Sequence, residues 1–185
     1  MENPMSRIPL QTADTAPAAS QALLGQVQAA FGATPNMFRA VANSPAALAS
    51  MWGSFGALGK GSLPARLTEQ VAVAIADRNR CEYCLAAHTL LGKNAGASEH
   101  EMADAQAGRS ADPATAAALA FALKVVDRRA DITDADITAL RNAGFTDEGI
   151  VELMAHVALN LFTNYVNIAF DVPVDFPAVK LRQAA

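Results

Sequence analysis

Both cysteines of this 185-residue chain lie in one short segment, Cys81-Glu-Tyr-Cys84-Leu-Ala-Ala-His88, which also holds one of its three histidines. On a helix, which turns by about 100° per residue, these three side chains fall within an arc of roughly 60°. A thiol reacts as its thiolate, and both a helix N-terminus and a nearby imidazole favour that form. The segment therefore predicts two thiols with a base beside them.

The spacing of Cys81 and Cys84 allows the two thiols to form a disulfide within one helix. One thiol can attack an oxidant and become a sulfenic acid, and the other can condense with it and release water. An external dithiol must then reduce the disulfide by exchange. The pair therefore indicates thiol-based redox chemistry that depends on a reducing partner.

Glu69 is the fourth candidate for this site. It lies in the middle of a helix expected from Ser62 to about Arg78, whose apolar residues occupy most of the circumference. A carboxylate on such a helix is either paired or has a perturbed pKa. The link to the cysteine segment is very short, so the two helices are neighbours. Glu69 can then fix the tautomer of His88 and take up its proton.

The rest of the sequence favours an all-α bundle of seven to nine helices in a single domain. The composition is 52% hydrophobic and rich in alanine, the best helix former, and no stretch alternates as a strand does. Residues 1–17 contain three prolines and are interpreted as an extended arm, and residues 18–185 as the helical domain. We expect Ser62 to cap the helix that carries Glu69, and Asn79 to cap the cysteine helix.

The last long helix carries a polar stripe whose role the sequence leaves open. The stripe either lines a pocket or satisfies a subunit interface, and His156 within it is interpreted as structural. Its members are His156, Asn160, Thr163, Asn164 and Asn167.

Composition excludes several classes of function. The net charge is −4 and the basic residues are scattered, so no surface is suited to nucleic acid or to an anionic membrane. No apolar run approaches the roughly 20 residues that span a bilayer, and the N-terminus lacks the pattern of a secretory signal. No nucleotide, haem or flavin motif is present, so no cofactor is predicted. We expect a cytoplasmic protein, in which Cys-x-x-Cys indicates redox chemistry or metal binding rather than a structural disulfide.

Taken together, these residues resemble the AhpD-like (alkylhydroperoxidase D) branch of the carboxymuconolactone decarboxylase family. The resemblance rests on Glu69, eleven intervening residues and Cys81-x-x-Cys84-x-x-x-His88, and on the end of the last helix from Asn160 onward. It implies an AhpD-like helical bundle, a homo-oligomer that is commonly a trimer or hexamer, and reduction of hydroperoxides at the expense of an external dithiol or disulfide reductase. It also implies that Cys84 is the peroxidatic cysteine, that Cys81 is its resolving partner and proton donor, and that His88 and Glu69 form a proton relay.

Tyr83 departs from the pattern of this branch, because the best-described members place a second histidine at that position. A tyrosine cannot act as a base near neutral pH, although its hydroxyl can donate a hydrogen bond. The redox pair stays intact, whereas the substrate and the reductase partner are left open.

Other interpretations of the motif stay open as well. The cysteines could be two small buried hydrophobic residues, or they could bind zinc together with His88 and Glu69. A single regular helix does not wrap a tetrahedral ion easily, and no second cysteine pair exists. The protein could also be a redox-responsive binding module, or a decarboxylase-type enzyme without redox chemistry. Decarboxylases of the family do not depend on this cysteine pair, so its presence argues against the last hypothesis.

Overall fold

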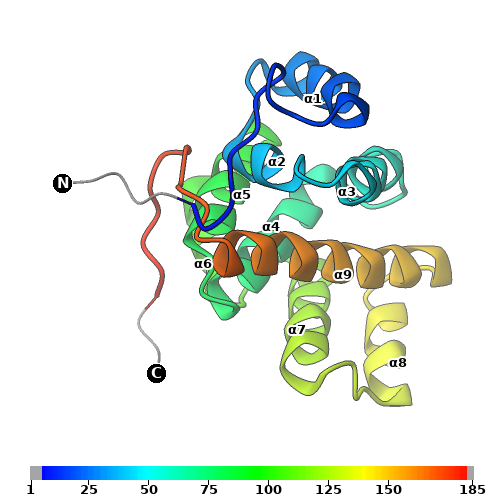
Figure 1. The fold of residues 1–185 in the computed structure, drawn as a ribbon. Helices are drawn as coiled ribbons and strands as arrows, with labels where there is room; N and C mark the ends of the chain where they lie inside the picture. Colours follow the sequence, from blue (N-terminus) through cyan, green and yellow to red (C-terminus); the bar gives the residue numbers. More distant parts are fainter. Residues whose placement is uncertain (1–5, 183–185) are drawn as a thin grey trace.

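The computed structural model describes residues 6–182, which form nine helices and no strand (Figure 1). The all-α fold expected from the sequence is therefore confirmed for this part of the chain. Residues 1–5 of the expected arm, and residues 183–185, lie outside the described residues. The helices are α1 (Ala18–Phe31), α2 (Asn36–Val41), α3 (Pro45–Leu58), α4 (Ala65–Arg78), α5 (Glu82–Asn94), α6 (Glu99–Gln106), α7 (Pro113–Arg128), α8 (Asp134–Asn142) and α9 (Asp147–Ala169).

Helix α4 is the central element of the bundle. It packs against α5, α6, α7 and α9, and every residue from Val71 to Asp77 is buried. Burial on all sides matches the apolar circumference of this segment and places Glu69 at a contact between helices. Ile75 is fully buried here, and replacing such a residue with alanine costs about 2–5 kcal/mol.

The connection between α4 and α5 is a sharp reversal that fixes the position of the cysteines. Asn79 ends α4, Arg80 adopts a left-handed conformation with φ of 63°, and Cys81 occupies the N-cap of α5. The expectation that Asn79 caps the cysteine helix is therefore wrong, because the reversal needs two further residues before α5 begins. The turn folds α5 back along α4, and these two helices form a close pair.

The start of α4 also differs from the expectation. Pro64 occupies the N-cap position, so Ser62 does not cap this helix. The Ser62 backbone N–H and hydroxyl both donate to Glu152 on α9, at 2.7 and 2.9 Å. A contact with a residue distant in the sequence thus replaces the local cap, and it ties the loop before α4 to the long helix.

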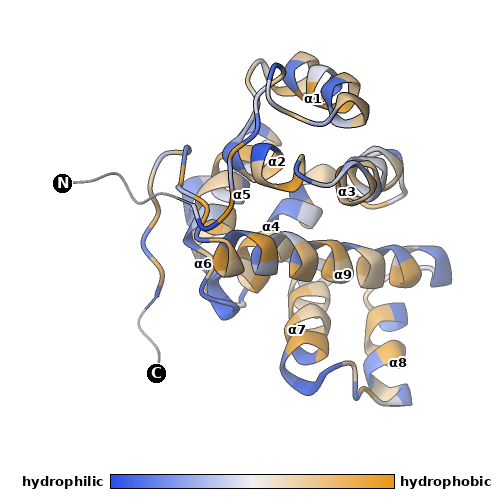
Figure 2. Ribbon diagram, viewed as in Figure 1, coloured by the Kyte–Doolittle hydropathy of each residue, from blue (hydrophilic) through white to orange (hydrophobic). Residues whose placement is uncertain are grey.

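Helix α9 crosses the molecule and forms one wall of the core (Figure 1). Leu153 and Val157 on its inner face are buried, whereas Val151 and Tyr165 on its outer face are 70% and 58% exposed. Apolar residues recur along the length of the helix (Figure 2). The outer face therefore leaves large apolar side chains in contact with solvent.

Two segments without helical structure cover the ends of α9 and α5. Residues 6–16 contain no helix, and the Arg7 backbone N–H donates to the Phe170 carbonyl at 2.8 Å. After α9 the chain continues as residues 171–182, which we call the C-terminal strap. Asp175 of the strap accepts a hydrogen bond from the Asn36 N–H, and the Arg182 N–H donates to buried Asp77.

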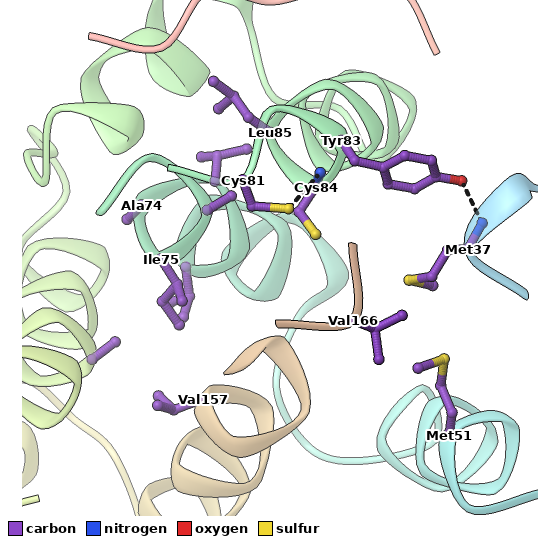
Figure 3. Packing of buried hydrophobic residues seen from close by; sticks show 14 of the residues in the cluster. Met37, Met51, Ala74, Ile75, Cys81, Tyr83, Cys84, Leu85, Val157 and Val166 are labelled. Atoms are coloured by element: carbon purple, nitrogen blue, oxygen red, sulfur yellow. Dashed lines mark hydrogen bonds between the residues drawn. The ribbon is translucent and has the colours of Figure 1, made fainter. Parts of the chain in front are cut away.

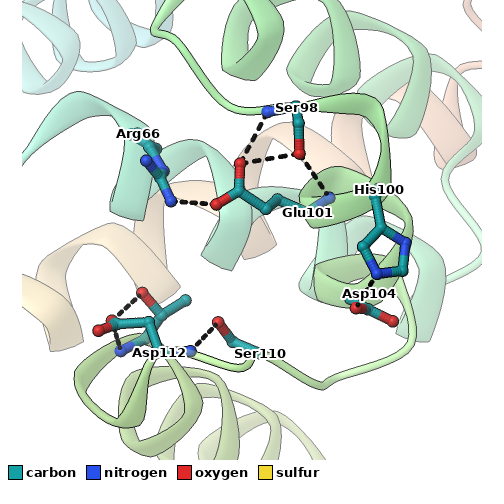
Figure 4. A network of polar contacts seen from close by, with 8 residues as sticks. Arg66, Ser98, His100, Glu101, Asp104, Ser110 and Asp112 are labelled. Atoms are coloured by element: carbon teal, nitrogen blue, oxygen red, sulfur yellow. Dashed lines mark hydrogen bonds and ion pairs between the residues drawn. The ribbon is translucent and has the colours of Figure 1, made fainter.

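Helix α6 is held against α4 by polar contacts at its N-terminus (Figure 4). Ser98 and Glu101 form a reciprocal capping box, and Arg66 of α4 pairs with the Glu101 carboxylate. Exposed ion pairs of this kind contribute about 0–1 kcal/mol, so the network orients α6 more than it stabilises the fold. Among the described residues, no helix combines the length and hydropathy needed to cross a membrane.

Candidate active site

Both cysteines lie at the N-terminus of α5, facing α4 and α9 (Figure 3). Cys81 is the N-cap residue, and its Sγ accepts a hydrogen bond from the Cys84 N–H at 3.3 Å. Cys84 lies in the first turn, where the helix dipole favours a negative charge. Both residues are free thiols and are buried, with 1% and 2% of their surface exposed.

Asn167 brings α9 into the site. Its Nδ2 donates to the Cys84 Sγ at 3.2 Å, and one turn earlier Asn164 accepts a hydrogen bond from Asn79 at 3.0 Å. Both asparagines are buried, so this part of the polar stripe faces the cysteines and not the surface. The sequence pattern identifies the stripe but does not pair it with α5, because the contact spans 83 positions along the chain.

The surroundings of the two thiols favour different ionisation states. Burial opposes ionisation of Cys84, but the hydrogen bond from the Cys81 thiol, the charge on His88 and the amides of Asn167 and Asn164 outweigh it and lower the pKa to about 7. The hydrogen bond to Cys84, burial and the Cys84 charge together raise the pKa of Cys81. Near neutral pH a large fraction of Cys84 is therefore thiolate, while Cys81 holds its proton.

Glu69 and His88 form a mostly buried pair between α4 and α5. The His88 Nδ1 lies 2.7 Å from the Glu69 Oε2, and the two side chains are 13% and 19% exposed. Burial alone would lower the pKa of His88, but the charge and hydrogen bond of Glu69 raise it overall. The imidazole is thus held in one orientation and is poised to carry a proton next to Cys84.

An apolar cavity of about 50 Å³ lies over Cys84 and His88, and we call it the aromatic pocket. Phenylalanines from three helices meet here, and the Phe38 and Phe55 rings lie 5.8 Å apart. The remaining wall brings together residues from α1, α2, α5, α9 and the strap. The lining residues are Phe31, Pro35, Met37, Phe38, Phe55, Tyr83, Cys84, Ala87, His88, Leu91, Thr163 and Phe176.

Tyr83 is a fixed part of this wall. Its hydroxyl oxygen accepts a hydrogen bond from the Met37 N–H at 3.1 Å (Figure 3). Its ring packs edge-on against Phe176, with the ring centroids 5.5 Å apart. Burial raises the pKa of Tyr83, so the side chain is a neutral phenol. At the position where the resemblance led us to expect a second histidine, this chain has a side chain that joins α5 to α2 and to the C-terminal strap.

A second, more polar cavity of about 180 Å³ lies on the other side of the Glu69–His88 pair. His156 and Asn160 of α9 line it together with Glu69 and His88. Within the described residues, the His156 Nε2 and the Asn160 Oδ1 are buried without a hydrogen-bond partner. Burial lowers the pKa of His156, so this imidazole is neutral beside the pair. Sequence spacing could not associate His156 with Glu69, because the two lie on different helices.

The structure thus brings together all four residues singled out from the sequence, in two groups. Cys81 and Cys84 contact one another, and Glu69 binds His88. In the described part of the chain, no group of three or more His, Cys, Asp and Glu side chains is arranged to hold a metal ion.

Comparisons with known proteins agree with the all-helical fold. Residues 43–128 match the carboxymuconolactone decarboxylase family, whereas no curated protein matched the sequence. A peroxidase-related protein from Ralstonia eutropha JMP134, described as an alkylhydroperoxidase AhpD core, is 28% identical, with a TM-score of 0.84 over 93% of this chain and 94% of its own. A peroxidase-related protein from Silicibacter sp. TM1040 is 25% identical, with a TM-score of 0.80 over 93% and 92%. The debrominase Bmp8 shares the fold at 20% identity, with a TM-score of 0.76 over 91% of this chain and 90% of its own.

Proposed function

We propose that this chain, whose residues 43–128 match the carboxymuconolactone decarboxylase family and whose fold is that of an AhpD core, is a thiol-dependent peroxidase with Cys84 as the nucleophile. One observation carries the proposal. The two adjacent buried thiols favour different ionisation states, because the pKa of Cys84 is lowered to about 7 while that of Cys81 is raised. A peroxidatic cycle needs one reactive thiolate and a neighbouring thiol that can condense with the sulfenic acid, and this pair supplies both.

The proposed reaction begins with the Cys84 thiolate, which attacks the terminal oxygen of a hydroperoxide. The O–O bond breaks, the alkoxide takes a proton and leaves as an alcohol, and Cys84 becomes a sulfenic acid. His88, oriented by Glu69, supplies the proton to the leaving oxygen. The Cys81 sulfur then attacks the Cys84 sulfur, water is released, and the disulfide forms. An external dithiol or disulfide reductase returns both residues to thiols.

The aromatic pocket supports a substrate class for this proposal. Its walls are phenylalanine, methionine and leucine side chains, and Cys84 lies among them. Apolar walls stabilise an apolar group by removing its surface from water, at about 25 cal/mol per Å². We therefore expect organic hydroperoxides with an apolar substituent to react faster than hydrogen peroxide.

The proposal extends to assembly and location. The outer face of α9 exposes Val151, Phe162, Tyr165 and Ile168, a row of large apolar side chains that a second copy of the chain would cover. This face supports a homo-oligomer, for which a trimer or hexamer is the expectation from the family. A cytoplasmic location would keep an external dithiol reduced, as the cycle requires.

A redox-responsive binding module is the second candidate, and one observation favours it. The Cys81 Sγ is itself the cap of α5, so a disulfide with Cys84 changes the hydrogen bond that begins the helix. Oxidation would then alter the segment that joins α4 to α5, without any need for rapid turnover.

The decisive experiment follows peroxide consumption with cumene hydroperoxide or hydrogen peroxide, and with dithiothreitol or dihydrolipoamide as reductant. Wild type should turn over, Cys84→Ser should be inactive, and Cys81→Ser should oxidise once without forming the intramolecular disulfide. Equal rates in wild type and Cys84→Ser would refute the peroxidase. A reversible disulfide without turnover under any reductant would favour the binding module.

A further inference from the structure

The two cysteines line different cavities, and we propose that the external dithiol enters by its own groove and attacks the disulfide at Cys81. This inference rests on the proposed redox cycle and specifies how its reductive half occurs. The groove, which we call the Cys81 groove, has a volume of about 290 Å³. It is lined by Arg80, Cys81, Glu82, Tyr83, Asn167, Ile168, Asp171, Val172, Pro173 and Val174.

Tyr83 separates the Cys81 groove from the aromatic pocket, because it lines both cavities. Its hydroxyl accepts the hydrogen bond from the Met37 N–H, and its ring packs edge-on against Phe176. Cys84 lies on the aromatic side of this partition and Cys81 on the other. Since both sulfurs are nearly fully buried, the cavity that each residue lines decides the direction from which a reagent reaches it.

The two cavities differ in chemistry as well as in position. The aromatic pocket has apolar walls, whereas Arg80, Glu82 and Asp171 bring charges of both signs to the Cys81 groove. Arg80 donates to the Arg182 carbonyl, and Asp171 lies 3.9 Å from Arg7, so two of these charges have partners at the rim. With Arg7 counted, the groove and its rim carry two charges of each sign, and such a surface beside Cys81 suits an uncharged dithiol, either free or at the end of a flexible arm.

The chemistry of exchange favours the same sulfur. A disulfide is cleaved faster when the departing thiol has the lower pKa. Attack at Cys81 expels the Cys84 thiolate, which accepts the Asn167 amide hydrogen bond at 3.2 Å and is stabilised by the charge on His88. Attack at Cys84 would instead expel Cys81, and the Asn167 amide would then face a sulfur that is bonded to the reductant. A hydrogen bond to a charged sulfur is worth about 1–2 pKa units, which corresponds to a preference of about three- to tenfold for attack at Cys81.

The disulfide is reduced in two successive exchange steps. The thiolate of the reductant forms a bond to the Cys81 sulfur, the bond between the two cysteines breaks, and the electron pair remains on Cys84. The second thiol of the reductant then attacks the reductant sulfur attached to Cys81. Cys81 leaves, takes up a proton, and the reductant departs as a disulfide.

The first test identifies the attacked sulfur without any peroxide. The full-length protein is oxidised with diamide, treated briefly with 2-mercaptoethanol, and quenched with excess iodoacetamide at pH 8. Trypsin cleaves after Arg80 and Lys93, so one peptide carries both cysteines and its fragment ions locate each adduct. We expect mercaptoethanol on Cys81 and the alkyl group on Cys84, in about three- to tenfold excess over the reverse. A majority of the reverse arrangement would overturn the proposal.

The second test blocks each cavity separately. Val174 is 40% exposed at the Cys81 groove, and Leu91 lines the aromatic pocket. Val174→Trp should slow reduction of the diamide-formed disulfide by dithiothreitol while leaving peroxide oxidation of Cys84 unchanged, and Leu91→Trp should do the opposite. If both variants slow both half-reactions equally, one shared entrance exists and the proposal fails. Failure of the peroxidase itself would appear separately, as a wild-type Cys84 that peroxide does not oxidise.

Discussion

The hydrogen bond from Asn167 to Cys84 makes a quantitative prediction about the reactivity of the nucleophile. Replacing Asn167 with leucine keeps the approximate size of the side chain and removes the amide donor that lies 3.2 Å from the Cys84 sulfur. The asparagine is 4% exposed, so water does not readily replace the lost donor. The variant should therefore destabilise the thiolate more than the thiol, and the pKa of Cys84 should rise.

The magnitude follows from the charge on the acceptor. Hydrogen bonds to charged groups are worth about 1.5–3 kcal/mol, and one pKa unit corresponds to about 1.4 kcal/mol, so the pKa should rise by about 1–2 units. Starting from about 7, the pKa of Cys84 would reach about 8–9. At pH 7 the thiolate fraction falls from about half to between roughly a tenth and a hundredth, which predicts an alkylation rate about 5- to 50-fold lower.

The assay measures the rate of iodoacetamide alkylation at Cys84 between pH 5 and pH 10, with the modified residue identified by mass spectrometry. Thr163→Val is the matched control, because Thr163 is buried on the same helix and its hydroxyl donates within α9 to the Asn160 carbonyl. The control should leave the alkylation midpoint in place. An unchanged midpoint in Asn167→Leu would refute the role assigned to this amide.

Three further predictions concern other parts of the molecule. Glu69→Gln should lower the pKa of His88, measured by NMR titration of the imidazole, and should shift the pH profile of peroxide reduction. Because Glu69 raises the pKa of His88, the ion pair stabilises the fold fully at pH values below 6.5, the ordinary pKa of histidine. This stabilisation is lost as the pH rises through the higher pKa of the folded protein, so thermal unfolding of Glu69→Gln should lack this pH dependence. Cys81→Ser should be as stable as the reduced wild type because serine is a good N-cap, whereas Cys81→Val should lose about 1 kcal/mol of unfolding free energy. Equal denaturant midpoints for the two variants would contradict the role of Cys81 as the N-cap. Val151→Glu combined with Tyr165→Glu should yield monomers in light scattering with an unchanged circular dichroism spectrum, and an unaltered mass would rule out this face as the interface.

The sequence predicted the helical fold and the relation of Glu69 to His88, because both follow from local patterns. Apolar residues around the whole of α4 indicate a central helix, and a short link to α5 requires the two helices to be neighbours. The cap of α5 was predicted wrongly for a local reason. Asn79 and Cys81 can both begin a helix, and only the left-handed turn at Arg80 decides between them.

Contacts between distant segments could not be predicted in this way. Asn167 meets Cys84 because α9 crosses the start of α5, and periodicity along one helix does not reveal its partner. The aromatic pocket likewise combines Phe31, Phe38, Phe55 and Phe176 from four separate segments. Tyr83 appeared from the sequence only as a missing histidine, whereas its role as a partition depends on Met37 and Phe176.

The N-cap formed by the Cys81 sulfur also bears on the reduction potential of the pair. In the reduced protein the Cys81 sulfur accepts the N-cap hydrogen bond of α5, and the Cys84 sulfur accepts a hydrogen bond from Asn167. Contacts that exist only in the reduced state make its formation more favourable, and about 1.4 kcal/mol of such stabilisation raises the potential of a two-electron couple by about 30 mV. The disulfide should therefore be a stronger oxidant than an unconstrained Cys-x-x-Cys peptide of the same sequence. The cap of one helix thus sets how readily a reductant returns the protein to its working state.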